Sequence, residues 1–408
     1  MATSRLPSGD EKLVAMIDLA RLRDAFRAHY GGEPRLFRAP GRVNLIGEHT
    51  DYNDGFVLPM AIDREVVVAA AARDDRRVRA FSLDLDAAVE FDLDRPGPKR
   101  RGSWLDYLEG VAQALEATGV RLTGAELAIT SDVPVGAGLS SSAALEVAAG
   151  MALTSVSRAN VGKLDLALAG QRAEHDYVGI NCGIMDQFTS ALARAGHALL
   201  IDCRSLEWRD IPLSTSHARV VICDSHVKHE LAISAYNTRR AECESGVKLL
   251  NKILPDIRAL RDVSTADFRR HEAQLPDRVR RRCRHVITEN ERTLAVANAL
   301  SVNDFDVMGR LMCASHASMR DDYEISCEEL DTLVEIAMTV NGVYGARMTG
   351  GGFGGCTVNV VARDALDRFR EVVVSGYRTA ARKAPTLYVS EAADGASEVR
   401  FPGSKKNS

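Results

Sequence analysis

The sequence lacks the patterns of several large protein classes. No eighteen apolar residues run together, and the first residues have no apolar core like that of a secretion signal, so we expect neither a membrane span nor a leader. The eight cysteines contain no CxxC pair and the ten histidines no HExxH pattern, which argues against a zinc site and favours reduced, separately buried thiols. The formal net charge of −4 leaves no general basic surface. We therefore expect a cytoplasmic protein with neither nucleic-acid nor membrane partners.

The remaining composition is that of a large globular protein. With 408 residues, of which 46% are apolar and 26% charged, the chain can bury a sizeable core and is long enough for two domains. The pattern of the sequence changes near residue 211, which predicts domains over 12–210 and 211–403. A local basic cluster runs from Arg278 to Arg284. We interpret it as a solvated helix face.

Hydrophobic periodicity predicts the main elements. Apolar residues at spacings of three and four predict helices over 12–31, 104–119, 164–178 and 285–300. Period-two alternation in VRAFSL and VEFDL predicts antiparallel strands in the first part of the chain.

The stretch 38–63 places polar residues between two apolar runs. These residues are Arg42, Glu48, His49 and Asp51. One reading is a strand, a turn at 53–55 and a second strand, with the charges on a solvated bend. The other is a site for a polyhydroxy ligand, because neighbouring Glu, His, Thr and Asp offer a donor or an acceptor to each hydroxyl.

A second stretch has the layout of a phosphate site. An alternating strand ends in the loop VGAGLSSS (135–142), and an Ala- and Leu-rich helix follows. Gly136 and Gly138 let backbone amides approach an anion, the serines add hydroxyl donors, and the helix N-terminus is electropositive. The alternative is a tight turn with a serine N-cap. No GxxxxGK[ST] sequence occurs in this loop, so it is not a P-loop.

A third stretch, YGARMTGGGFGGC (344–356), is crowded with glycine and lies between two strand-like runs. Such a cluster is either a flexible hairpin or a close approach of backbone to a ligand or another loop.

In this order, the three stretches resemble the motifs of the galactokinases, within the GHMP family of small-molecule kinases. The similarity extends from about residue 36 to residue 362, with one departure at Ala137, where the family often has glycine. The resemblance implies an α/β (α+β) fold of two domains with the active site in the interdomain cleft. It implies ATP-dependent phosphorylation of galactose at the anomeric hydroxyl, with Mg²⁺ beside the nucleotide. We expect galactose and ATP as partners of a monomeric enzyme.

The resemblance also assigns site residues. Asp186 and Arg42 would be catalytic. The sugar would be held by Glu48, His49, Thr50, Asp51, Gly183 and Tyr236. ATP would be held by Trp104, Gly136, Ala137, Gly138, Leu139, Ser140, Ser141 and Ser142. Mg²⁺ would be held by Ser142 and Glu174, because this hard cation prefers oxygen ligands.

Four of these residues also have ordinary structural readings. Asp186 could be a helix N-cap, and Glu174 could be one of the many helical glutamates that are merely solvated. Tyr236 as a bare residue would more often sit at the edge of a core, and Trp104 could pack in one.

Two other functions share most of these motifs. A sister kinase for N-acetylgalactosamine or arabinose would keep the nucleotide motifs and differ in its sugar contacts; the unbroken GEHTDYN favours galactose. A catalytically silent sensor of galactose and ATP would lose residues at the end of the phosphate loop. The complete SSSAA sequence, with Arg42, Glu174 and Asp186 present, favours the enzyme.

Overall fold

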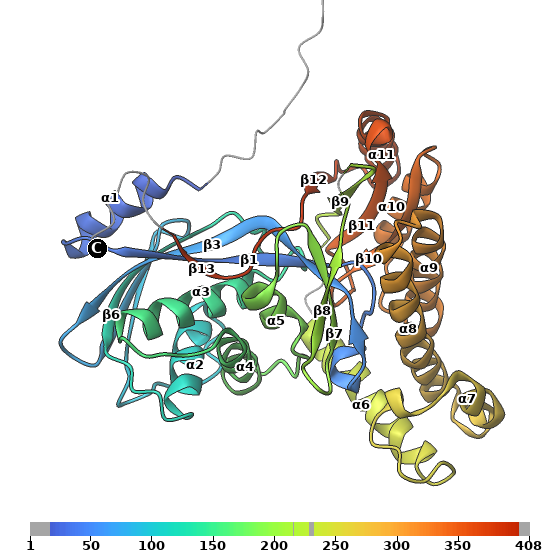
Figure 1. Ribbon diagram of the computed structural model, residues 1–408, viewed down its shortest axis with the longest axis horizontal. Helices are drawn as coiled ribbons and strands as arrows, with labels where there is room; N and C mark the ends of the chain where they lie inside the picture. The colour runs from blue at the N-terminus through green and yellow to red at the C-terminus, as the bar shows by residue number, and fades with distance from the viewer. Residues whose placement is uncertain (1–16, 215, 228–231, 400–408) are drawn as a thin grey trace, which may run out of the picture.

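The computed structural model describes residues 17–214, 216–227 and 232–399. Its elements form two regions around separate sheets, and a small third sheet lies between them (Figure 1).

The first region is built on a six-stranded mixed sheet in the order β13-β1-β3-β6-β4-β5. Its strands are β1 (Arg35–Asn44), β3 (Pro59–Arg73), β4 (Arg77–Ser82), β5 (Ala87–Asp92), β6 (Gly124–Ser131) and β13 (Ser397–Val399). Neighbours are antiparallel except β4 and β6, which run parallel. The predicted antiparallel strands are confirmed, since VRAFS and AAVEFD form the pair β4 and β5.

Helices cover both faces of this sheet (Figure 1). They are α1 (Leu19–Tyr30) on one face and α2 (Leu105–Glu116), α3 (Ser141–Val156), α4 (Lys163–Ala173) and α5 (Met185–Leu192) on the other. Because both faces are buried, the central strand β3 carries a nearly continuous apolar run instead of an alternating one. The helix α3 is buried through most of its length, so its many alanines allow close packing.

The predicted helix boundaries need correction at three places, one of them the helix predicted over 285–300, which is the end of a longer helix, Asp277–Ser301. The helix predicted over 12–31 begins at Leu19 because the Asp18 carboxylate accepts the backbone N–H groups of Ala20 and Arg21; residues 12–16 lie outside the described part of the chain. The helix predicted over 164–178 ends its α form at Ala173 and continues as a five-residue π turn, Glu174–Val178.

The second region has a four-stranded antiparallel sheet in the order β10-β11-β9-β12 with helices packed beside it (Figure 1). Its strands are β9 (Ala218–Asp224), β10 (Val343–Thr349), β11 (Cys356–Ala362) and β12 (Thr386–Ser390). Its helices are α6 (Ala232–Leu250), α7 (Thr265–His271), α8 (Asp277–Ser301), α9 (Phe305–Ser318), α10 (Glu328–Met338) and α11 (Leu366–Ala381).

The three-stranded sheet joins distant parts of the chain. It consists of β2 (Phe56–Val57), β7 (His197–Asp202) and β8 (Trp208–Pro212). The second sheet begins with β9 after residue 217, whereas β13 returns to the first sheet beside β1. The domain limits 12–210 and 211–403 stay a prediction.

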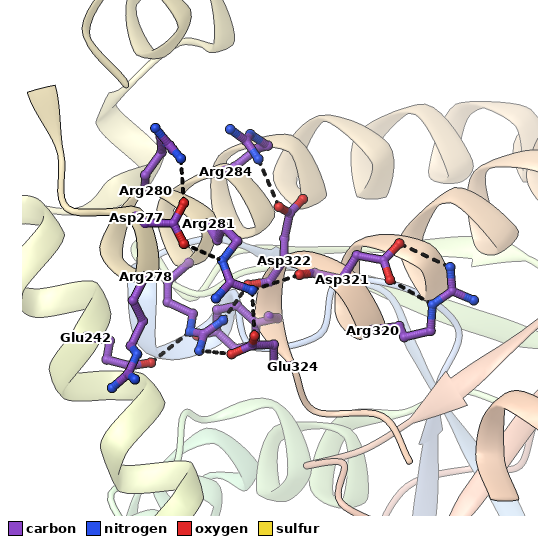
Figure 2. Close-up of polar contacts among 12 residues, drawn as sticks. Glu242, Asp277, Arg278, Arg280, Arg281, Arg284, Arg320, Asp321, Asp322 and Glu324 are labelled. Atoms are coloured by element: carbon purple, nitrogen blue, oxygen red, sulfur yellow. Dashed lines mark hydrogen bonds and ion pairs between the residues drawn. The ribbon is translucent and has the colours of Figure 1, made fainter. Parts of the chain in front are cut away.

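The arginine cluster at the start of α8 is not simply a solvated face. Arg282 is 1% exposed and donates to Glu242 on α6, to the Asp322 carbonyl and to Glu324. Figure 2 shows neighbouring arginines pointing toward acidic side chains, some on other elements and one, Asp277, on α8 itself, with Arg278 near Glu242. The predicted solvated face is therefore wrong for Arg282. This residue is buried, and its acidic partners come from other parts of the chain.

Within the described ranges, none of the helices has the length and apolar character needed to span a bilayer. All eight cysteines are free thiols, four of them buried and four half-buried.

Candidate active site

The residues predicted to be catalytic form an ion pair. Arg42, on β1, is 4% exposed, and its Nε and Nη2 donate to the two carboxylate oxygens of Asp186 at 2.8 Å each. Asp186 lies in the first turn of α5, whose N-cap position is Ile184. The N-cap reading of Asp186 is therefore wrong. Its carboxylate is fixed by a bidentate guanidinium, which holds both charge and orientation.

The phosphate-like loop meets this pair directly. Arg42 Nη1 donates to the Gly138 carbonyl at 2.6 Å, and the Ser140 hydroxyl donates to Asp186 Oδ2 at 2.6 Å. Ser140 occupies the N-cap position of α3, as the alternative reading has it, but its side chain makes no capping hydrogen bond within the described residues and donates to Asp186 instead. Loop and carboxylate thus belong to one hydrogen-bond network.

The backbone of the loop explains its glycines. Gly136 and Gly138 both have φ of 76°, a conformation that side chains disfavour. Ala137 between them has no positive φ, so its departure from glycine does not strain the loop. Leu139 is buried, and its carbonyl accepts the Arg42 backbone N–H at 3.1 Å.

The third glycine stretch packs against this loop. It connects β10 and β11, and a Cβ added at Gly350 or Gly355 would lie 3.0 Å from the carbonyl oxygen of Gly138 or Ala137 respectively. Of the two readings of this cluster, the close approach to another loop is confirmed.

Glu174 has the character of a cation ligand. It is 5% exposed and accepts a hydrogen bond from Ser142, but its Oε2 atom is buried without a hydrogen-bond partner among the described residues. Burial, together with the charge of Asp186, raises the pKa of Glu174 to about 7. The reading as a solvated helical glutamate is therefore wrong. An unpartnered buried carboxylate oxygen beside a hydroxyl fits a divalent cation.

Within the described residues, no three His, Cys, Asp or Glu side chains gather into a metal site. Nucleotide phosphates would therefore have to complete the coordination of a cation at Ser142 and Glu174, the common arrangement for Mg²⁺.

Asp51 and Gly183 lie against each other on the sugar-binding side predicted above. Asp51 opens a short 3₁₀ turn, Asp51–Asn53, and any Cβ at Gly183 would collide with its carboxyl group. Burial, and then the nearby charge of Asp186, raises the pKa of Asp51 to about 7. The carboxyl groups of Asp51 and Asp186 are therefore near enough to interact electrostatically.

Glu48 and Thr50 are engaged by the protein itself. Glu48 Oε1 accepts the Gly350 N–H at 2.8 Å, and Oε2 accepts the Asn44 amide. The buried guanidinium of Arg347 lies 3.5 Å from Glu48 Oε1. The Thr50 hydroxyl lies within hydrogen-bond distance of two backbone carbonyl oxygens, those of residues 47 and 56. Both residues shape the loop, and their direct contact with sugar stays a prediction.

His49 and Tyr236 bring α6 to the same loop. The centroid of the Tyr236 ring lies 5.1 Å from that of His49 and 5.3 Å from that of Tyr52. His49 Nε2 lies 3.2 Å from the carbonyl oxygen of Gly351, in the third glycine stretch. Parts of the chain separated by about three hundred residues therefore meet at one point.

Trp104 and Ser141 have fewer contacts. Trp104 precedes α2 and is half-buried against the apolar core, which agrees with its structural reading. Ser141 is the half-buried first residue of α3. The predicted contacts of both residues with ATP stay predictions.

Sequence reasoning missed several residues at this site. They are Asn44, Tyr52, Arg347 and Tyr323. Tyr52 directly follows Asp51 and could have been noticed. Arg347 and Tyr323 carry no local signal, because only the packing of the second region brings them to residues 48–52.

Known proteins share the sequence motifs that build this site. The galactokinase galactose-binding signature matches residues 24–72, the N-terminal domain of GHMP kinases 106–194 and their C-terminal domain 295–378. A galactokinase from Chloroflexus aurantiacus is 53% identical over 363 residues, covering 89% of this chain and 93% of that protein. The chain belongs to the galactokinase family. A galactokinase from Roseiflexus sp. is 50% identical over 385 residues, covering 94% of this chain and 98% of that one.

Solved structures agree with the galactokinase assignment. Lactococcus lactis galactokinase complexed with galactose has a TM-score of 0.90 at 36% identity, covering 93% of this chain and all of that one. Methanococcus jannaschii mevalonate kinase has a TM-score of 0.61 at 17% identity, with coverage of 89% and 99%, which shows a shared fold alone. The predicted two-domain GHMP kinase fold is confirmed. Membership of the galactokinase family makes the chain an ATP-using phosphotransferase.

Proposed function

We propose that this chain transfers the γ-phosphoryl group of ATP to the anomeric hydroxyl of galactose, giving galactose 1-phosphate and ADP, with Asp186 and Arg42 as catalytic residues. The observation that carries the assignment of roles is the bidentate pair of these residues, linked to the phosphate-like loop through Ser140 and Gly138. The network supports these roles, because it brings the carboxylate proposed to orient the acceptor next to the loop proposed to bind the phosphates.

The chemistry follows from charge and position. Phosphoryl transfer passes through a loose transition state, so catalysis depends on in-line placement and on neutralising charge over the phosphate oxygens. Arg42 and the loop amides supply positive charge. Asp186 orients the sugar hydroxyl and accepts its proton late in the transfer, because a carboxylate is a weak base for an alcohol.

Ser142 and Glu174 would hold Mg²⁺ beside the nucleotide, where the cation would neutralise charge on the phosphates. Support comes from the buried Oε2 of Glu174, which has no hydrogen-bond partner in the described part of the chain.

Sugar recognition is assigned to Asp51, Gly183 and Tyr236, within a frame made by Glu48, His49 and Thr50. Asp51 accepts bonds from sugar hydroxyls, and the wrong epimer leaves a buried partner unpaired at a cost of about 1 to 3 kcal/mol. Galactose and ATP are thus the small-molecule partners of the enzyme, which we propose to be a cytoplasmic monomer. Its eight free thiols are consistent with a reducing compartment.

A substrate panel tests this function. ATP consumption is measured with galactose, glucose, N-acetylgalactosamine and arabinose at equal concentrations. We expect galactose to give the highest kcat/KM. A preference for N-acetylgalactosamine or arabinose would identify a sister kinase, and sugar binding without ATP consumption would identify a sensor; either result would overturn the proposal.

A further inference from the structure

A line of hydrogen bonds runs from the sugar-binding side into the second region. His49 Nδ1 lies 2.6 Å from the Tyr52 hydroxyl, which lies 2.8 Å from the Tyr323 hydroxyl, and this lies 3.1 Å from the sulfur of Cys243. Tyr323 and Cys243 are buried, and His49 is only 4% exposed. The functional assignment above gives no role to Tyr52, Tyr323 or Cys243.

The second ring nitrogen of His49, Nε2, determines which group donates and which accepts along this line. Its Nε2 lies 3.2 Å from the Gly351 carbonyl, which can only accept, so Nε2 carries the proton. Burial lowers the pKa of His49 to about 3, so the ring is neutral and its Nδ1 must accept from Tyr52. The Tyr52 oxygen then accepts from Tyr323, whose own oxygen accepts from the Cys243 thiol. Each group has one orientation that satisfies the line.

The backbone is in an uncommon conformation at two residues of this line, His49 and Tyr323. His49 has φ of 61°, in the left-handed region. Tyr323 ends a five-residue π turn, Met319–Tyr323, and its carbonyl accepts Arg239 Nε at 2.7 Å. The arginine cluster of Figure 2 holds the same turn, since Arg282 donates to the Asp322 carbonyl. These hydrogen bonds fix the backbone that carries the Tyr323 side chain.

We propose that Tyr52, Tyr323 and Cys243 are positioning residues that fix the tautomer of His49 and hold its ring between Tyr236 and the Gly351 carbonyl. The sugar pocket is then formed before galactose arrives, and its shape depends on a hydrogen-bond line that does not touch the reacting atoms. The role in sugar binding rests on the proposed function; the tautomer of His49 does not.

Three conservative variants test the line from its near end to its far end. Tyr52→Phe leaves Nδ1 of His49 without a donor, so we expect galactose binding, measured by calorimetry, to weaken about tenfold, or about 1.4 kcal/mol. Tyr323→Phe and Cys243→Ala should weaken it progressively less. The ATP constant and kcat at saturating galactose should change less than about threefold, because ground-state sugar binding alone is affected.

A matched control and a direct readout separate positioning from general stability. Tyr377→Phe removes another fully buried hydroxyl, one that donates to the Ser225 carbonyl at 3.1 Å, and should leave galactose binding unchanged. The ¹⁵N shifts of His49, identified by their absence in His49→Gln, report the tautomer. In wild type they should show a protonated Nε2, and in Tyr52→Phe a mixture of tautomers.

An unchanged galactose constant together with unchanged His49 shifts in Tyr52→Phe would overturn the proposal. An equal loss in the Tyr377→Phe control would do so too. Should Tyr52→Phe fail to fold, Tyr323→Phe tests the line through galactose binding, because Tyr52 would still donate to His49 but would lack the donor that holds its own hydroxyl; an unchanged galactose constant in that variant would overturn the proposal. The wild-type protein could fail to bind galactose while its His49 tautomer still depends on Tyr52. That result would refute the proposed function but not the hydrogen-bond line.

Discussion

The two sides of the site are built in different ways. The catalytic side comes from the first region alone, with Arg42 on β1, Asp186 on α5 and the loop before α3. The sugar side is joined across the chain by hydrogen bonds from the Gly350 N–H to Glu48 and from His49 to the Gly351 carbonyl. Charge chemistry is therefore a property of one region, whereas sugar recognition depends on how the second region packs. Substitutions on the two sides should separate turnover from sugar affinity and stability.

The largest expected effect is on the catalytic side. Asp186→Asn keeps the shape and removes the charge that orients the acceptor, so kcat should fall by roughly 10² to 10⁴, the usual loss for an acid-base group. Galactose and ATP constants should stay within a few-fold. Asp210→Asn is the matched control: its side chain is 29% exposed, like that of Asp186, but pairs with exposed Arg194. Near-normal turnover of Asp186→Asn in steady-state assays would remove Asp186 from catalysis.

The next effect concerns stability on the sugar side. Arg347 is fully buried, and its Nη2 lies 3.5 Å from Glu48 and 3.9 Å from Glu289. Arg347→Met leaves two buried carboxylates without their shared cation, so the free energy of unfolding should fall by about 3 to 5 kcal/mol. Arg320→Met, which breaks an exposed pair with Asp321, should cost less than about 1 kcal/mol. Equal denaturant midpoints for the two variants would refute this part of the comparison.

A smaller effect isolates sugar recognition. Asp51→Ala removes a carboxylate suited to accept from two sugar hydroxyls, and charge-assisted bonds of this kind contribute about 1.5 to 3 kcal/mol each. The galactose constant should rise tenfold or more, since about 1.4 kcal/mol is a factor of ten, while the ATP constant stays within a few-fold. Asp54→Ala, at a more exposed carboxylate three residues away, should change neither. A loss that appears in ATP binding instead would contradict the assignment of the whole 48–51 run.

The smallest effect is a dependence of stability on pH. Burial raises the pKa of Asp51 from 3.8 to about 7, so between these values the folded state holds a proton that the unfolded chain has lost. The contribution of Asp51 to stability is therefore full below about pH 4 and is lost as pH rises through about 7. Asp51→Asn cannot titrate, so its Tm should fall less than that of wild type between pH 5 and pH 8. Parallel Tm profiles would show that Asp51 is not perturbed.

The same contrast explains what the sequence could predict. The catalytic side could be predicted because its motifs are local: the glycines of the loop 135–142 and the serines after them lie within one short stretch, and Asp186 lies in another. The β4 and β5 strands were likewise readable from alternation. The burial of Arg282, the start of α1 at Leu19 and the pairing of β13 with β1 were not predicted. The burial of Arg282 and the pairing of β13 depend on partners far away in the sequence. The start of α1 depends on the Asp18 cap, which hydrophobic periodicity does not indicate.

The sugar side shows this limit most clearly. The run 48–51 was recognisable as a polar cluster, but three of its partners, Gly350, Gly351 and Arg347, come from β10 and the glycine stretch after it. Tyr323 reaches the loop only because a π turn interrupts the end of a helix. No local pattern specifies such a meeting.

The most direct test of the central claim follows the phosphate to its acceptor atom. Wild-type protein is incubated with ATP, Mg²⁺ and galactose labelled with ¹³C at the anomeric carbon, and the products are followed by ¹³C and ³¹P NMR. We predict that the labelled carbon acquires a coupling to phosphorus while ATP is converted to ADP, and that Asp186→Asn slows its appearance by at least a hundredfold. Phosphate on any other carbon, or ATP conversion that does not depend on galactose, would contradict the account.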